Sequence, residues 1–259
     1  MALVCKVMHW RLRAWLGWRF ETNFLKVRMR VVNVKVDFIS DVACPWCAIG
    51  LGALEQAIAR LGDELHVQVL FHPFELNPQM PPGGQDATEY LAHKYGVTAA
   101  QQAATRQMQC ERAAEVGVVF RPEGRGRIYN TFDAHRLLYW AGQEDAAVAA
   151  DEQAAQGRQH ALKKALLNAY FGQGLPPESH EVLLRLASQV GLDEPRAAAI
   201  LASTDYADEV RTQQAVHAQA GFHSVPTLIL NDAYLLSGAQ PVDVLEAALR
   251  QAAETAVAD

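Results

Sequence analysis

The chain has 259 residues, of which 50% are hydrophobic and 20% are charged, a composition typical of globular proteins. This length suits one large domain or two smaller ones. The formal net charge is −6, which argues against nucleic acid as the main partner. Charged residues interrupt every apolar run, so we expect no membrane span.

The first 30 residues differ from the rest in charge. They contain seven Lys or Arg residues and one Glu, whereas the remaining chain has 16 basic and 28 acidic side chains. They lack the long apolar run and cleavage site of a secretory signal, so we expect a cytoplasmic protein. The segment could rest on an anionic membrane as an interfacial helix. We favour an extension at 1–30 that is disordered or upstream of the true start, with Met29 as initiator.

A buried strand is predicted for residues 31–39, because β-branched and aromatic residues dominate there. Apolar residues then recur at helical spacing from Ile49 to Leu61. Cys44 therefore lies at or just before the first turn of a helix, where free backbone N–H groups and the helix dipole favour a thiolate. Cys47 follows at the spacing that permits a disulfide with Cys44. This pattern is typical of dithiol–disulfide exchange.

The remaining elements divide into a helical middle and a β-rich end. Residues 65–71 form a second predicted strand, and the turn cluster at 81–84 follows. Helices are expected from about 86 to 220, and strand character returns at 225–230 and 233–237, before a last helix. Because the β-rich ends must pair, the helices form an insertion. The predicted helix N-caps are Thr98, Asn130, Ser179 and Asp193.

Three stretches, at 37–47, 74–78 and 130–136, resemble the FrnE-like subgroup of the DsbA-family thiol–disulfide oxidoreductases. The resemblance extends over residues 31 to 252. It implies an α/β protein with a thioredoxin fold interrupted by a long helical insertion. The implied thioredoxin-fold domain comprises 31–80 and 196–255, and the helical insertion domain comprises 81–195.

The expected activity is exchange between the Cys44–Cys47 pair and disulfides of proteins or small molecules. Cys44 would attack and Cys47 would resolve the mixed disulfide. Pro45 and Trp46 would set the local geometry. The family fold implies a cis bond before Pro226, facing the cysteines. His223, Ser224 and Val225 would then line the substrate site.

The protein's own dithiol is the only expected cofactor, with glutathione as a candidate reductant. The four cysteines and scattered histidines lack zinc-ligand spacing, so no metal site is predicted. Cys110 is expected to be a core residue. The oligomeric state stays open, with a homodimer among the options.

Two further residues have two interpretations each. Asp37 could accept the proton of Cys47, or it could be a strand-end residue that faces solvent. Arg136 could bind a substrate carboxylate, such as that of glutathione, or form an ion pair with Asp133 three residues earlier. We favour the ion pair for Arg136 and give the two interpretations of Asp37 equal weight. Asp41 is a further candidate, as a cap of the helix that follows Cys47.

Two other functions compete with disulfide exchange. The 2-hydroxychromene-2-carboxylate isomerases and kappa-class glutathione transferases share the skeleton, but they carry serine at the Cys44 position and lack the second cysteine. A binding module that keeps only the fold would be expected to lose one cysteine. Because both cysteines are present here, redox chemistry is the favoured interpretation.

Overall fold

A computed structural model describes residues 32–148 and 157–258. The predictions for residues 1–30, including the proposed start at Met29, lie outside the described residues. The described part forms one compact unit, and the predicted boundaries at 80/81 and 195/196 fall within it. No helix in this part of the chain is long and apolar enough to span a bilayer.

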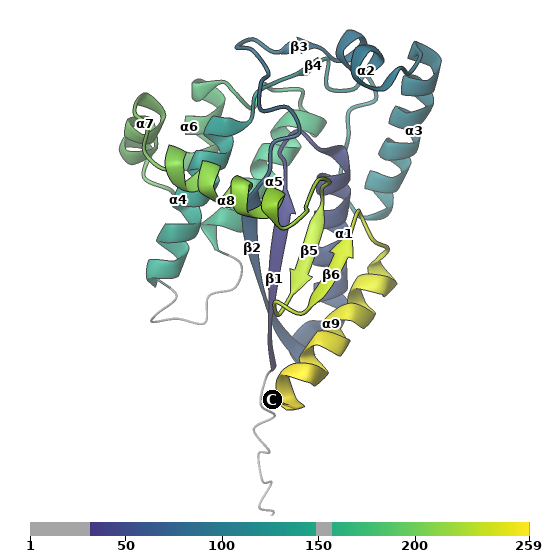
Figure 1. Cartoon of the computed structure of the whole chain (residues 1–259), viewed down its shortest axis with the longest axis vertical. Helices are drawn as coiled ribbons and strands as arrows, with labels where there is room; N and C mark the ends of the chain where they lie inside the picture. Colours follow the sequence, from purple (N-terminus) through teal and green to yellow (C-terminus); the bar gives the residue numbers. More distant parts are fainter. Residues whose placement is uncertain (1–31, 149–156, 259) are drawn as a thin grey trace, which may run out of the picture. The chain divides into compact units, whose positions relative to one another are not determined.

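A four-stranded mixed sheet forms the centre of this unit, in the order β2-β1-β5-β6 (Figure 1). β1 (Val32–Ser40) pairs in parallel with β2 (Leu65–Pro73) and antiparallel with β5 (Thr227–Leu230). β6 (Tyr234–Ser237) completes a hairpin with β5. The strands from the two ends of the chain therefore join in one sheet, and the expected fold class is confirmed.

Helices cover both faces of the sheet. α1 (Pro45–Leu61) and α9 (Val242–Ala258) pack together, and their apolar side chains share a core with those of β1. α8 (Ala207–Gln219) crosses β2 and β1 on the side that faces the viewer in Figure 1. Along β1, Val34, Val36 and Phe38 belong to the α1 core, so the residues between them point to the opposite face.

The insertion has a second apolar core, which is built from α4 (Phe132–Val148), α5 (Arg158–Leu167), α6 (His180–Gln189) and α7 (Glu194–Ala202). Val42 from the loop after β1 also belongs to this core. The next residue, Ala43, belongs to the sheet core. The two cores therefore meet immediately before Cys44. The other elements of the insertion are β3 (Gln85–Asp86), α2 (Ala87–Tyr95), α3 (Ala99–Glu115), β4 (Arg127–Ile128) and the short π-helix η2 (Asn168–Gly172). Outside the insertion, the short 3-10 helix η1 (Gly62–Glu64) connects α1 to β2.

Three of the four predicted helix caps are confirmed. Thr98 forms a capping box with Gln101, and Ser179 and Asp193 cap α6 and α7. Asn130 lies one position early, because the carbonyl of Thr131 accepts the first helical bond, from the N–H of His135. The Asn130 side chain instead accepts a bond from the N–H of Phe132, as in an Asx turn.

Candidate active site

Cys44 is the N-cap residue of α1. Its extended backbone (φ −94°, ψ 116°) is followed by Pro45 in the first turn, a position that suits proline because its missing N–H would have no helical partner. The Cys44 carbonyl accepts bonds from the N–H groups of Cys47 (3.1 Å) and Ala48 (3.4 Å). The loop after β1 thus places Cys44 at the N-terminus of α1, which is the positive end of the helix dipole.

The two thiols are in unequal environments. Both are free; Cys44 is 4% exposed, and Cys47 is fully buried one turn further along α1. A hydrogen bond from the Cys47 thiol lowers the pKa of Cys44 most; burial opposes this effect, and the N–H groups of Cys47 and Trp46 add to it. Burial raises the pKa of Cys47 well above its ordinary value, and the neighbouring Cys44 adds to that rise. When one of the two thiols loses its proton, the thiolate therefore forms at Cys44 and Cys47 keeps its proton.

The loop before β5 lies against Cys44. The Val225–Pro226 bond is cis, and the Cys44 thiol donates to the carbonyl of Val225 at 3.5 Å. A Cβ added at Gly50 of α1 would lie 3.1 Å from Pro226 Cγ, so the glycine allows this proline to pack closely on the helix. The hydroxyl of Thr227 donates to the Ser224 carbonyl at 2.9 Å and fixes the loop.

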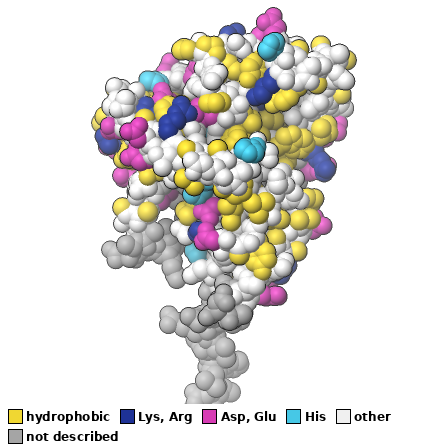
Figure 2. Space-filling view, viewed as in Figure 1, with side chains coloured by type: hydrophobic (Ala, Val, Ile, Leu, Met, Phe, Trp, Pro, Cys, Tyr) yellow, Lys and Arg dark blue, Asp and Glu magenta, His cyan; other side chains and the backbone are white. Residues whose placement is uncertain are grey.

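A cleft of about 600 Å³ opens beside Cys44. Its lining includes Pro45 and Trp46 from the start of α1, residues 223–225 from the loop before β5, and side chains of α2 and α3. Figure 2 shows hydrophobic side chains gathered on the surface between α3 and the strands β5 and β6. The lining residues contributed by the insertion include Leu91, Tyr95, Cys110, Phe120, Arg125 and Phe171.

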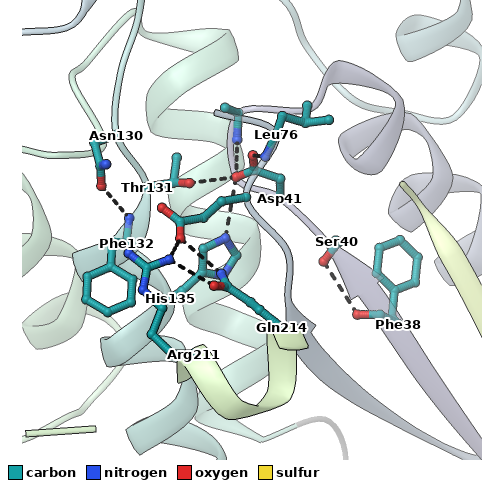
Figure 3. Close-up of polar contacts among 12 residues, drawn as sticks. Phe38, Ser40, Asp41, Leu76, Asn130, Thr131, Phe132, His135, Arg211 and Gln214 are labelled. Atoms are coloured by element: carbon teal, nitrogen blue, oxygen red, sulfur yellow. Dashed lines mark hydrogen bonds and ion pairs between the residues drawn. The ribbon is translucent and has the colours of Figure 1, made fainter. Parts of the chain in front are cut away.

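Asp41 is a buried acceptor directly before the cysteine pair (Figure 3). Its carboxylate accepts bonds from the N–H of Ala43 (3.0 Å), the N–H of Leu76 (2.7 Å) and the hydroxyl of Thr131 (2.8 Å), and it lies 3.4 Å from Nε2 of His135. Burial pushes the pKa of Asp41 upward, but these bonds, led by His135, outweigh burial and lower it. Asp41 is therefore an anion that connects three chain segments: the loop after β1, the segment after β2 and the start of α4.

A second polar group in Figure 3 anchors α8. The Arg211 guanidinium pairs with the buried carboxylate of Glu75 and lies 3.8 Å from the ring centroid of Phe132. Gln214 donates to the same carboxylate at 3.1 Å. These contacts hold α8 against the segment after β2 and the start of α4, beside the Asp41 network.

Comparison with known proteins identifies the family. The family model for DsbA-like thioredoxin domains matches residues 35–250. The chain belongs to this DsbA-like family. A solved structure from Streptomyces coelicolor, described as a probable DsbA oxidoreductase, is 35% identical, with a TM-score of 0.72, over 85% of this chain and 89% of that one.

Two further relatives are more distant. An uncharacterized Bacillus subtilis protein, YwbO, is 27% identical over 224 residues, which are 84% of this chain and 96% of that protein. A 2-hydroxychromene-2-carboxylate isomerase structure shares the fold, with 15% identity and a TM-score of 0.61, over 87% of this chain and 99% of that one.

Asp37 of this DsbA-like domain lies away from the cysteine pair. It points to the sheet face opposite α1, where it bonds Nε2 of His72 (2.8 Å) and Nζ of Lys35 (3.0 Å). Burial pushes its pKa upward, but the bonds from His72 and Lys35 outweigh burial and lower it. The structure therefore does not place Asp37 where it could take a proton from Cys47.

Arg136 is a structural residue, so of its two interpretations substrate binding is wrong and the favoured ion pair is correct. It is 4% exposed, and its guanidinium bonds Asp133 (2.8 Å) and the carbonyls of Ser203 (2.7 Å), Asp205 (2.9 Å) and Ile200. These bonds use most of the guanidinium N–H groups and connect α4 to the end of α7. The favoured interpretation, an ion pair with Asp133, is the one that the structure shows.

Cys110 is half-buried and lines the cleft beside Cys44, so its prediction as a core residue is wrong. α3 has Ala113 as its only buried residue, because one side of this helix faces the cleft and the other faces solvent. Within residues 32–148 and 157–258, no group of three or more His, Cys, Asp or Glu side chains could hold a metal ion.

Lys163 of α5 is a buried ionisable residue that the sequence interpretation missed. It is fully buried, and its Nζ has no hydrogen-bond partner in the described part of the chain. The ionisable groups that act on it are Cys47, Asp41 and Cys44. A signal for its burial exists in the sequence, because Leu166 and Leu167 follow at helical spacing and place Lys163 on the apolar face.

Proposed function

We propose that this protein is a FrnE-like thiol–disulfide oxidoreductase whose Cys44–Cys47 pair cycles between dithiol and disulfide. The observation that carries the proposal is the difference between the two thiols. Cys44 has a lowered pKa and lies at a helix N-terminus beside a cleft, whereas Cys47 is fully buried with a raised pKa. This is the asymmetry that a nucleophile and a resolving thiol require.

The reaction has two balanced exchanges. The Cys44 thiolate attacks one sulfur of a substrate disulfide, forms a mixed disulfide, and the other substrate sulfur leaves as a thiolate. Cys47 then loses its proton and attacks Cys44 Sγ, which forms the Cys44–Cys47 disulfide and releases the second substrate thiolate. The same steps in reverse oxidise a substrate dithiol, so the direction depends on the potential of the pair relative to its surroundings.

The cleft supports binding of disulfide-containing proteins or small molecules. The Val225 carbonyl lies at the attacking sulfur, so an extended substrate peptide can pair with this main chain. His223 and Ser224 from the same loop line this cleft, as do Pro45 and Trp46 from the start of α1. We expect cytoplasmic activity with glutathione as a reductant, and no cofactor beyond the dithiol.

A glutathione-dependent isomerase or transferase is the second candidate, because the isomerase shares this fold. One observation argues against it: a second thiol, that of Cys47, lies one turn behind Cys44 on α1 and lowers the pKa of Cys44. An isomerase or transferase would not need a second thiol at this position, whereas disulfide exchange requires one.

The pH dependence of alkylation tests the assigned roles. Cys44 should react with iodoacetamide faster than Cys47 at neutral pH, and the pH midpoint of its reaction should lie below that of an unperturbed thiol. The lowered pKa of Cys44 keeps its thiolate populated as the pH falls. Peptide mapping with mass spectrometry measures both rates, with Cys110 as an internal reference. Faster reaction at Cys47 would contradict the assignment.

A further inference from the structure

The cleft beside Cys44 carries an excess of positive charge in a chain that is otherwise acidic. Residues 31–259 contain 16 basic and 28 acidic side chains. The Lys, Arg, Asp and Glu side chains that line the cleft are Arg106, Arg121, Glu123 and Arg125. Glu123 pairs with Nε of Arg121 at 3.4 Å, so these two charges compensate each other. The excess of positive charge therefore lies on Arg106 and Arg125.

Arg125 holds its guanidinium beside the cysteine pair. Its Nη1 donates to the carbonyl of Ala43 at 2.6 Å, and Ala43 is the residue directly before Cys44. The guanidinium carbon also lies 5.8 Å from the ring centroid of Phe171. A guanidinium has five N–H donors, and the bond to Ala43 uses one of them. Donors therefore remain for a ligand that occupies the cleft next to Cys44.

Both of these arginines lack an anionic partner. Nε of Arg106 donates to the carbonyl of Pro122 at 3.0 Å, and the bond of Arg125 also goes to a carbonyl. Neither forms an ion pair with an Asp or Glu of residues 32–148 or 157–258. Both side chains are half-buried, so salt screens their charges less than those of fully exposed arginines. Such a site favours a ligand that brings its own negative charge.

The size and lining of the cleft fit a small molecule. Its volume is about 600 Å³, within the range of about 300–1,000 Å³ that small-molecule sites occupy. Phe120 and Phe171 line it, and their rings stack with centroids 4.8 Å apart. Apolar walls with a few placed polar groups bind small ligands and fix their orientation. The cleft therefore combines apolar contact area with a cation beside the attacking sulfur.

We propose that the preferred substrate is a small disulfide that carries a carboxylate, and that Arg125 binds this carboxylate while Cys44 attacks the disulfide. The carboxylate accepts N–H bonds from the guanidinium, which holds the nearby substrate sulfur at Cys44. The cation also offsets the repulsion between the Cys44 thiolate and an anionic substrate. The bonds that form and break are those of the two exchanges described above. The inference rests on the proposed function and names its substrate class and a specificity residue.

Three small disulfides with different end groups test this inference on the full-length protein. Dithiodipropionate, hydroxyethyl disulfide and cystamine share two-carbon arms, which end in a carboxylate, a hydroxyl and an ammonium. The reduced protein is mixed with an excess of one disulfide at neutral pH, quenched with acid and alkylated. Mass spectrometry measures the loss of the free Cys44 thiol and the formation of the Cys44–Cys47 disulfide. Mercaptoethanol, reacted with the same disulfides, corrects for their intrinsic reactivity.

The wild-type protein should prefer the anionic disulfide. After the correction, we expect the second-order rate constant to be about 10-fold higher for dithiodipropionate than for hydroxyethyl disulfide, because a charge-assisted contact is gained. Cystamine should react more slowly than both, since the cleft repels its ammonium groups.

Arg125→Met should abolish most of this preference. We expect the ratio of the rate constants for dithiodipropionate and hydroxyethyl disulfide to fall by about 10-fold. Arg125→Lys keeps the charge but not the planar fork, so it should recover part of the ratio. Arg185→Met is the matched control, because Arg185 of α6 is exposed and does not line the cleft. It makes the same change in net charge and should keep the wild-type ratio.

Two outcomes would overturn the inference. In one, the wild-type protein shows no preference for the carboxylate after the correction. In the other, Arg125→Met slows the reaction with all three disulfides equally, as expected if Arg125 only holds the loop before Cys44. The ratio compares substrates on one folded sample, so a loss of stability in the variant does not change it. If the wild-type protein formed no Cys44–Cys47 disulfide with any of the three, the proposed function itself would be contradicted.

Discussion

Cys44→Ser should reduce the rate of insulin-disulfide reduction to that of the blank, whereas Cys47→Ser should accumulate a mixed disulfide with the substrate. The difference follows from the structure. Of the two cysteines of the pair, only Cys44 lines the cleft, has the lowered pKa and lies at the helix N-terminus. Without Cys47, the first exchange still occurs, but no second thiol behind Cys44 releases the bound substrate.

Mass spectrometry under non-reducing conditions measures the trapped species. The mass of Cys47→Ser should rise by one substrate chain, and peptide mapping should locate the bond at Cys44. Cys110→Ser is the matched control, because Cys110 lines the same cleft from α3 and has no role in the mechanism. A substrate adduct on Cys110, or full activity of Cys44→Ser, would contradict the assigned roles.

Asp41→Ala should lower the free energy of unfolding by about 3–5 kcal/mol, the cost of removing one member of a buried charged network. Four groups would lose their acceptor in a buried site: the N–H groups of Ala43 and Leu76, the hydroxyl of Thr131 and the ring of His135. Urea unfolding measures the change. A loss below about 1 kcal/mol, typical of a surface position, would mean that the network contributes little.

Acid should also reveal the Asp41 anion. Its pKa in the folded protein is lowered, so its contribution to stability is fully present above about 3.9, the unfolded value, and is lost as the pH falls through the folded value. Asp41→Asn should therefore flatten the loss of stability in this acidic range. A slope equal to that of the wild type would exclude a lowered pKa at Asp41.

The same substitution should act on Cys44. The negative charge of Asp41 raises the pKa of Cys44, so its removal in Asp41→Asn should lower that pKa further, measured by thiolate absorbance or alkylation. Asp37→Asn is the matched control. Asp37 is also a carboxylate with hydrogen-bonded and ion-paired partners, but it lies on the sheet face opposite to α1 and the cysteine pair. It should leave the pKa of Cys44 unchanged.

The sequence predicted features that depend on neighbouring residues. The strand β1, Cys44 at the helix N-terminus and the caps Thr98, Ser179 and Asp193 follow from local propensity and hydrogen bonding. The pairing of the two ends of the chain followed from the need of strands for partners. β3 and β4 were missed, since two residues each are too few for a sequence pattern.

The side-chain roles in the site depend on contacts between distant segments. Asp37 and Asp41 are both acidic residues shortly before Cys44. The sequence does not show which face of β1 is covered by α1, so it could not show that Asp37 points away from the cysteine pair and that Asp41 acts on Cys44. Arg136 bonds carbonyl groups at the end of α7, which leave no signature in the sequence. Lys163 could be placed on a buried helix face, but its complete burial without a hydrogen-bond partner depends on how α5 packs against distant segments.

The most direct test of the central claim is a redox titration of the wild-type protein with mixtures of reduced and oxidised glutathione. The samples are quenched with acid, alkylated and analysed by mass spectrometry. We expect one two-electron transition to an internal Cys44–Cys47 disulfide, at a potential between about −270 and −120 mV, the values of thioredoxin and DsbA. If oxidation instead left a stable glutathione adduct on Cys44 beside a free Cys47 thiol, the pair would not be a redox centre.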